Sequence, residues 1–225
     1  MDSFTVSEDL VTSPSHKQAG TSHTDFDGLL AAKRQLKLHE DLAQGNGGQA
    51  WPAGHVLAKY LLRTCRETLR DCSIVELGAG GGLVGLSVAL GCKLRQPIYI
   101  TDQAPMLPLM QKNIELNGLQ DHVKAIIYNW GDSRPDNIPS HPDVVLAADC
   151  VYFEPAFPLL CKTLEDLIGP ETTCYFCFKK RRRADMQFVK AVRKAFEVEP
   201  VLDDPDQKTY ARENITLCTI KRKHL

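Results

Sequence analysis

A glycine-rich segment in the first half of the chain has the residue types and spacing to hold a small molecule. It runs from Val75 to Gly85 as VELGAGGGLVG, after a strand-like run and before a helix-like one. Glycines at positions 78, 80 and 82 let the backbone turn tightly and approach a ligand without Cβ collisions. The dinucleotide fingerprint G-x-G-x-x-G would need a glycine where the chain has Leu83. The segment therefore predicts a cofactor loop without the usual pyrophosphate-binding form; a ligand-free glycine turn is the alternative.

Two carboxylates accompany this loop at the ends of consecutive predicted strands. Glu76 precedes the glycines, and Asp102 ends the next strand, about 20 residues beyond the loop. A carboxylate beside the loop suits a ligand with cationic groups and would repel pyrophosphate. S-adenosylmethionine fits this description, because it has an α-amino group and a sulfonium but no phosphate. Asp102 would then hydrogen-bond the ribose hydroxyls, although an isolated aspartate at a strand end is usually a capping or turn residue.

A third acid, Asp149, ends the apolar run DVVLAADC at residues 143–150. This run is typical of a central strand covered on both faces, where burying a carboxylate without a purpose is costly. The carboxyl edge of such a sheet is where ligands bind in open α/β folds. The position therefore predicts a site residue. Tyr152 and Phe153 follow closely, and these aromatics could also simply cover the end of the sheet.

The elements that must position these residues alternate between strand-like and helix-like patterns. Seven strands are predicted at residues 73–77, 98–101, 123–128, 143–150, 172–178, 196–201 and 215–221. Helices are predicted at residues 51–69, 83–90, 105–117, 158–168 and 184–195. This alternation predicts an α/β fold with a Rossmann-like, seven-stranded, mostly parallel sheet and helices on both faces. The last two strands have no room between them for a full helix, so they should form a C-terminal antiparallel pair.

The rest of the chain predicts one domain with an N-terminal extension. Residues 1–25 are rich in Ser, Thr, His and Asp and predict a flexible tail. Within the extension, residues 26–70, the stretch 35–41 alternates like a short exposed strand and Gly45-Asn-Gly-Gly48 forces a turn. No interior linker divides residues 26–225, so we expect a single domain.

Composition and cysteine usage are those of a globular protein in a reducing compartment. The net charge of −1 gives no global attraction to nucleic acid or anionic membranes. The apolar runs are far shorter than the about 20 residues that span a bilayer, and early acids argue against a secretory signal. The eight cysteines lie partly in strand-like runs, which indicates the cytosol or nucleus. Cys174 and Cys177 have CxxC spacing without partners at zinc-finger spacing, so we predict strand core and no metal site.

A basic run, KKRRR at residues 179–183, follows the fifth predicted strand. A solvated surface run is the default interpretation. Its place at the carboxyl edge would also let it dock an acidic face of a protein substrate. Contact with RNA phosphates ranks last, because no stacking aromatics interleave with the basic residues.

Five segments together carry a resemblance to a known family. They are WPAG at 51–54, ELGAGGGLVGL at 76–86, ITD at 100–102, NWGD at 129–132 and DVVLAADCVYFEP at 143–155. With them the chain resembles the seven-β-strand, class I S-adenosylmethionine-dependent methyltransferases, and within these the family-16 methyltransferase-like protein-lysine N-methyltransferases. Residues 179–185 also resemble fungal members that methylate elongation factor 1A. The resemblance implies S-adenosyl-L-methionine as cofactor and elongation factor 1A as protein substrate; we also expect a cytoplasmic monomer that binds neither membrane nor nucleic acid.

The resemblance also assigns most of the candidate site residues. Those matched to cofactor contacts are Trp51 at the methionine end, Gly78, Ala79 and Gly80 in the loop, Asp102 at the ribose, and Trp130 and Ala148 in the adenine pocket. Glu76 joins them from the charge argument above. The D-x-x-Y signature of the family matches Asp149 and Tyr152, which we expect to be catalytic by orienting the substrate amine.

Two of these positions and the neighbouring Gly81 have qualifications of their own. Gly81 departs from the family, whose members often have threonine there, but backbone atoms make most of the contacts. Without the resemblance, Trp51 before a proline would be a helix-start residue. Trp130 would then be as readily a core aromatic.

Other functions on this fold stay open at this point. A methyltransferase acting on a small molecule or on nucleic acid is the first, because fold does not fix substrate. RNA and DNA amino-methylating enzymes commonly have N/D-P-P-Y/F where this chain has DCVY, which disfavours them. A non-catalytic partner subunit that keeps the cofactor pocket is the second. A dehydrogenase is disfavoured by Leu83.

Overall fold

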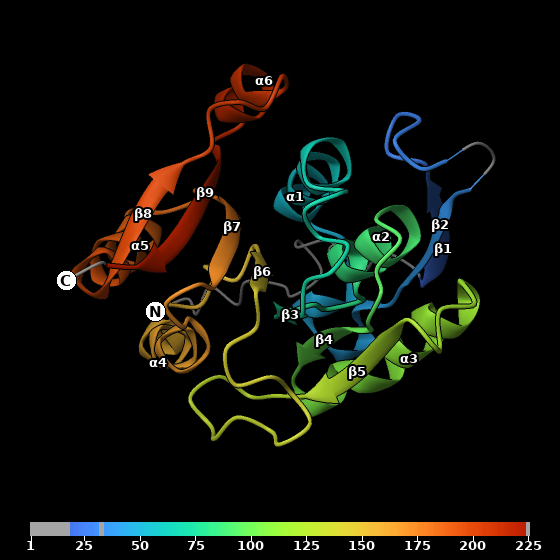
Figure 1. The fold of residues 1–225 in the computed structure, drawn as a ribbon, viewed down its shortest axis with the longest axis horizontal. Coiled ribbons are helices and arrows are strands. Elements are labelled where there is room, and N and C mark those ends of the chain that lie inside the picture. Colours follow the sequence, from blue (N-terminus) through green and yellow to red (C-terminus); the bar gives the residue numbers. More distant parts are fainter. Residues whose placement is uncertain (1–18, 32–33, 224–225) are drawn as a thin grey trace, which may run out of the picture.

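A seven-stranded sheet forms the centre of the computed structural model, which describes residues 19–31 and 34–223 (Figure 1). The strand order is β5-β4-β3-β6-β7-β9-β8. The strands are β3 (Ile74–Leu77), β4 (Ile98–Asp102), β5 (Val123–Ile127), β6 (Val144–Ala148), β7 (Thr173–Lys179), β8 (Phe196–Pro200) and β9 (Ile215–Arg222). The first five in this order are parallel, and β9 is antiparallel to both β7 and β8. The predicted Rossmann-like sheet with a C-terminal antiparallel pair is confirmed.

Helices cover both faces of this sheet. They are α1 (Pro52–Thr64), α2 (Leu83–Gly91), α3 (Leu107–Leu116), α4 (Phe157–Leu167), α5 (Arg183–Ala195) and α6 (Gln207–Arg212). Successive strand residues point to opposite faces, so Ile74 joins the core under α1 and α2 whereas Val75 joins the core under α4 and α5. Burying each such side chain contributes about 1.5–3 kcal/mol. The sheet therefore has an apolar layer on each side, and its polar site lies at an edge.

One predicted helix is shorter than expected. The pattern predicted residues 51–69, but α1 ends at Thr64 and the chain continues in turns. Leu69, which extended the apolar pattern, is buried in the core from one of these turns. Leu69 continues the helical spacing of apolar residues in the sequence, so the pattern predicted a longer helix than the structure has.

The N-terminal extension forms a two-stranded ladder against the domain. β1 (Gly20–Thr24) pairs antiparallel with β2 (Leu36–Glu40). The predicted tail through residue 25 is therefore too long: residues 1–18 lie outside the described part, but residues 20–24 form a strand. β2 alternates as predicted, yet it is not exposed throughout, because Leu36 and Leu38 are buried in the core. The tail prediction was wrong for β1 because the ladder depends on a partner strand, which local composition does not reveal.

The CxxC pair lies in strand core, as predicted. Cys174 and Cys177 are both buried in β7, and they join the cores on opposite faces of the sheet. Their side chains therefore point away from each other. Within residues 19–31 and 34–223, no group of three or more His, Cys, Asp or Glu side chains could hold a metal ion. None of the helices in this part of the chain has the length and hydropathy to cross a membrane.

Candidate active site

One cavity of about 390 Å³ opens at the carboxyl ends of the parallel strands. All ten residues predicted for the site line it: Trp51, Glu76, Gly78, Ala79, Gly80, Asp102, Trp130, Ala148, Asp149 and Tyr152. They meet because β3, β4 and β6 are parallel neighbours that end at the same edge. Ligands bind at this edge in open α/β sheets. The structure thus brings the predicted residues together, and their individual roles stay predictions.

The glycine loop after β3 needs glycine for two different reasons. Gly78, Gly80 and Gly82 have φ of +61°, +55° and +88°, in the region that side chains rarely adopt. A Cβ on Gly80 would also lie 2.4 Å from the carbonyl oxygen of Gly47. A Cβ on Gly78 would lie 2.9 Å from the indole of Trp130. The loop therefore packs closely against Gly47 at one position and against Trp130 at another, and residues 78–80 line the cavity.

Asp102 fastens this loop to the end of β4. Its Oδ2 accepts a hydrogen bond from the backbone N–H of Gly80 at 2.7 Å, and its Oδ1 accepts one from Gln103 at 2.7 Å. A carboxylate oxygen can accept a second hydrogen bond, so both remain able to receive ribose hydroxyls. Burial raises the pKa of Asp102, while these two backbone bonds favour its ionised form. The carboxylate that was predicted to hold the ribose thus also shapes the loop.

Glu76 lines the cavity and is almost completely buried. Its Oε2 accepts a hydrogen bond from the backbone N–H of Gly85 at 2.8 Å. Burial raises the pKa of Glu76 to about 8. The side chain is therefore mostly protonated at pH 7 in the free protein, whereas the sequence argument assumed a carboxylate. A cationic group placed beside it would lower this pKa and favour the charged form.

The two tryptophans stand on different sides of the cavity. Trp51 is the residue before α1, and its Nε1 donates a hydrogen bond to the carbonyl oxygen of Asn46 at 2.9 Å. Trp130, half-buried, follows β5 and packs both against the loop at Gly78 and on the core under α4. Trp51 therefore does more than start a helix, and Trp130 is at once a core contact and a cavity wall.

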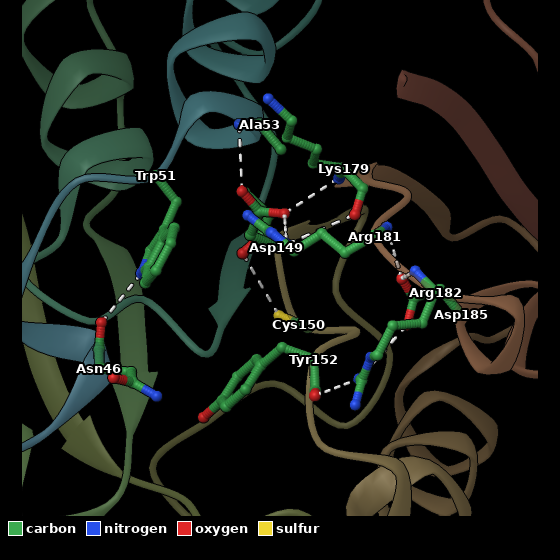
Figure 2. A network of polar contacts seen from close by, with 11 residues as sticks. Asn46, Trp51, Ala53, Asp149, Cys150, Tyr152, Lys179, Arg181, Arg182 and Asp185 are labelled. Carbon is green, nitrogen blue, oxygen red and sulfur yellow. Dashed lines mark hydrogen bonds and ion pairs between the residues drawn. The ribbon is translucent and has the colours of Figure 1, made fainter. Parts of the chain in front are cut away.

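Asp149 connects its own strand end with the start of α1 and the end of β7, at the wall of the cavity (Figure 2). Its Oδ2 accepts a hydrogen bond from the backbone N–H of Ala53 at 3.2 Å, at the start of α1. Its Oδ1 accepts from the backbone N–H of Lys179 and from Nη1 of Arg181, both at 3.0 Å. The residue has a φ of +53°, and such a conformation in a non-glycine residue costs roughly 1–3 kcal/mol and is typical of functional sites.

Aromatic side chains form the outer rim on this side. Tyr152 lines the cavity and is 48% exposed, and Phe153 beside it is 57% exposed. Partial burial raises the pKa of the Tyr152 hydroxyl, so it stays protonated at neutral pH. Arg182 donates a hydrogen bond to the backbone carbonyl of Tyr152 (Figure 2). The rim thus offers apolar surface and a hydroxyl to a partner outside the cavity.

The sequence missed several residues of the cavity wall. Residues 45–50 also line the cavity, and they approach the glycine loop through Gly47. The density of glycine directly before Trp51 could have indicated this second loop, which we predicted only as a turn. Met106 and Arg181 also line the cavity, and neither had a recognisable pattern; Arg181 in particular was part of a run that resembled solvated surface.

Solved structures with this fold bind S-adenosylmethionine or its product. The T. thermophilus 16S rRNA methyltransferase RsmC, in complex with AdoMet and guanosine, matches with a TM-score of 0.61 at 13% identity and covers 92% of this chain and 50% of its own. The SAH-bound Podospora anserina methyltransferase PaMTH1 matches with a TM-score of 0.53 at 13% identity, covering 79% and 81% of the two chains. At these identities the likeness concerns the fold. The chain therefore has the fold of these methyltransferases, with the glycine loop and its two acids at the ligand-binding edge of the sheet.

Sequence comparisons then identify the family. A family model described as lysine methyltransferase matches residues 30–195. The protein-lysine N-methyltransferase EFM6 of Saccharomyces cerevisiae is 36% identical, over 96% of both chains. The mouse protein N-lysine methyltransferase METTL21A is 33% identical over 80% of this chain and 82% of its own. Mouse EEF1A lysine methyltransferase 3 is 34% identical over 72% and 69%. The chain belongs to the lysine methyltransferase family.

Proposed function

We propose that this enzyme transfers a methyl group from S-adenosylmethionine to a lysine side chain of elongation factor 1A. The family membership supports the lysine, and the similarity to EEF1A lysine methyltransferase 3 supports the protein. The observation that carries the proposal is one cavity that brings two groups of residues together. We call the glycine loop with Glu76 and Asp102 the cofactor end, and Asp149 with Tyr152 the acceptor end.

The cofactor end has a group for each part of the cofactor. Asp102 would accept the ribose hydroxyls, and the bare backbone of Gly78–Gly80 would hold the amino acid portion. Trp51 would pack at the methionine end, and a cationic α-amino group beside Glu76 would favour the ionised form of that side chain. Trp130 and Ala148 would cover the adenine. The positive φ values at the glycines and the free acceptor sites of Asp102 fit such a ligand.

At the acceptor end the residues of the chain position an amine. Bound S-adenosylmethionine supplies a methyl group on an activated sulfonium, so alignment and exclusion of water are what the protein must provide. A lysine nitrogen has to lose its proton before it can attack, and a buried slot beside a cation lowers the pKa of that lysine. Asp149 would accept a hydrogen bond from the amine and orient it, and Tyr152 would close the slot from the rim. Since three donors already bind its carboxylate, positioning suits Asp149 better than acting as a free base.

The experiment is a transfer assay with purified components. The full chain is incubated with tritiated S-adenosylmethionine and purified elongation factor 1A, and the products are separated on a denaturing gel. We expect a labelled elongation factor band that disappears with Asp149→Ala. An unlabelled band, with cofactor binding demonstrated by calorimetry, would refute this substrate and favour a small-molecule acceptor or a non-catalytic partner subunit.

We further propose a cytoplasmic monomer that binds no nucleic acid, with residues 26–225 as a single domain. Support for the domain comes from the sheet, since the helices of the described part pack on its two faces. Support for the compartment comes from the eight cysteines, which are all free thiols. Sedimentation of the purified chain and binding assays with transfer RNA and ribosomal RNA test the other two points.

A further inference from the structure

The side chain of Arg181 enters the acceptor end of the cavity from the end of β7. Its Nη1 lies 3.0 Å from Oδ1 of Asp149, and its guanidinium carbon lies 5.1 Å from the centre of the Trp51 ring system. Figure 2 shows the side chain extended toward both partners. Arg181 is also one of the residues that line the cavity. A cation of the protein itself thus lies between a buried carboxylate and an aromatic ring.

These two partners form a binding site for a cationic side chain. A carboxylate binds a cation through charge-assisted hydrogen bonds. An aromatic ring attracts a cation placed over its face. Asp149 is 3% exposed, so its charge is costly to leave without a cationic partner in the free protein. Arg181 supplies that partner.

Arg181 is attached in a way that lets its side chain leave without disturbing its backbone. Its own N–H donates to the buried carboxylate of Asp185 at 2.7 Å, which fixes the main chain at the start of α5. The side chain itself is 31% exposed and reaches the cavity from its mouth. Rotation about its own bonds therefore moves the guanidinium into solvent.

We propose that Arg181 is an internal placeholder for the substrate lysine, an inference that rests on the proposed lysine methylation. In the free enzyme its guanidinium occupies the position between Asp149 and Trp51. The incoming lysine side chain displaces it, and Arg181 turns outward at the mouth. Arg181 keeps Asp149 paired until a substrate arrives. A substrate side chain must displace the guanidinium from Asp149 and Trp51 in order to bind, so the site selects cationic side chains.

A binding measurement tests this displacement without catalysis. The probe is n-butylammonium, which has the length and charge of a lysine side chain, added at constant ionic strength to the ¹⁵N-labelled full chain saturated with S-adenosylhomocysteine. The indole N–H resonance of Trp51 reports binding, and it is assigned by comparison with Trp130→Phe. We expect Arg181→Gln to bind the probe about fivefold more tightly than the wild type, because the competing ion pair and ring contact are removed.

Two variants serve as matched controls for this titration. Arg181→Lys keeps a competing cation and should bind the probe like the wild type. Arg183→Gln removes an equal charge from an exposed site of the same basic run, and it should also bind the probe like the wild type. Equal or weaker binding of the probe by Arg181→Gln than by the wild type would overturn the proposal. n-Butanol at the same concentrations should leave the Trp51 resonance unmoved, because the site selects charge.

Steady-state methylation provides the second readout. If Arg181 competes with the substrate, Arg181→Gln lowers the KM for elongation factor 1A about fivefold with little change in kcat. If Arg181 instead positions Asp149 during transfer, kcat falls and KM stays, which would overturn the proposal. A chain in which Arg181→Gln tightens probe binding but no variant methylates elongation factor 1A would refute the proposed function and leave the displacement intact.

Discussion

The two ends of the cavity hold their acids in different ways. At the cofactor end, the side chains of Glu76 and Asp102 accept hydrogen bonds from backbone N–H groups of the described residues, those of Gly85, Gly80 and Gln103. At the acceptor end, Asp149 binds two backbone N–H groups and also a side chain, that of Arg181, which is itself partly exposed. The acids of the cofactor end are therefore held by main chain, whereas the acid of the acceptor end is held partly by a side chain that is partly exposed.

This difference matches what each end has to do. Hydrogen bonds from backbone N–H groups hold an acid in place independently of the neighbouring side chains. Such an arrangement suits the cofactor, which is the same molecule in every reaction. Tyr152 and Phe153 are exposed and Arg181 is partly exposed, so these side chains have room to adjust to a protein surface. Substitutions at the cofactor end should consequently change affinity for the cofactor or stability, whereas those at the acceptor end should change turnover or substrate affinity.

The largest effect should come from Asp149→Asn. Losing the charge and one acceptor position misplaces the amine, and a misplacement of this kind lowers kcat about 100-fold. Rates with tritiated S-adenosylmethionine at saturating substrate measure this change. Cofactor affinity by calorimetry is the control and should remain within a few-fold of the wild type. An equal loss in both quantities would break the comparison, because Asp149 would then belong to the cofactor end.

The reverse pattern is expected for Asp102→Ala. Removing an acceptor for the ribose hydroxyls and for the Gly80 N–H should weaken cofactor binding about 10- to 100-fold, since hydrogen bonds to a charged group contribute about 1.5–3 kcal/mol. Isothermal titration calorimetry measures the dissociation constant. At saturating cofactor, kcat should recover to near the wild-type value. Unchanged affinity would remove the ribose role from Asp102.

A smaller effect, on stability, should follow from Gly80→Ala. Its Cβ would lie 2.4 Å from the carbonyl oxygen of Gly47, and overpacking of this kind costs about 1–3 kcal/mol. Gly118→Ala is the matched control, because Gly118 also has a positive φ of +65° but nothing within 4 Å of the added Cβ. Urea unfolding of both variants separates the clash from the backbone strain. Equal destabilisation of the two variants would show that the close approach of Gly80 to Gly47 adds nothing to the cost of the positive φ.

The last prediction concerns the pH dependence of stability, of which one component is assigned to Glu76. Burial raises its pKa from an ordinary value of 4.5 to about 8 in the folded chain. The folded state therefore holds this proton where the unfolded state has released it, so stability falls as pH rises from 4.5 to about 8. Glu76→Gln should lack this component of the slope in urea unfolding between pH 5 and pH 8. Parallel curves for the two proteins would contradict a buried, protonated Glu76.

Much of the fold could be predicted because its pattern is local. Strand–helix alternation, apolar runs and the glycine segment are properties of a few neighbouring residues, and they correctly located the seven strands and predicted a mostly parallel sheet with a C-terminal antiparallel pair. The same is true of the acids at strand ends: parallel strands end at one edge, so Glu76, Asp102 and Asp149 had to meet there.

The parts that escaped prediction depend on contacts between distant residues. The strand β1 exists through its pairing with β2, and the wall formed by residues 45–50 exists through the approach of Gly47 to Gly80. Nothing in the composition of either segment reveals its partner. The protonation of Glu76 was missed for the same reason, because burial is a property of the packed molecule.

The sequence by itself determined the class of fold, the cofactor loop and the edge at which the site lies, because each follows from periodicity and residue type along the chain. Only the tertiary structure decided what surrounds each acid. Arg181 is 32 positions from Asp149 in a run that resembles solvated surface, and packing turned its side chain inward onto a buried carboxylate. Side-chain partners of this kind are chosen by three-dimensional proximity and by the cost of leaving a buried charge unpaired, and neither can be read along the chain.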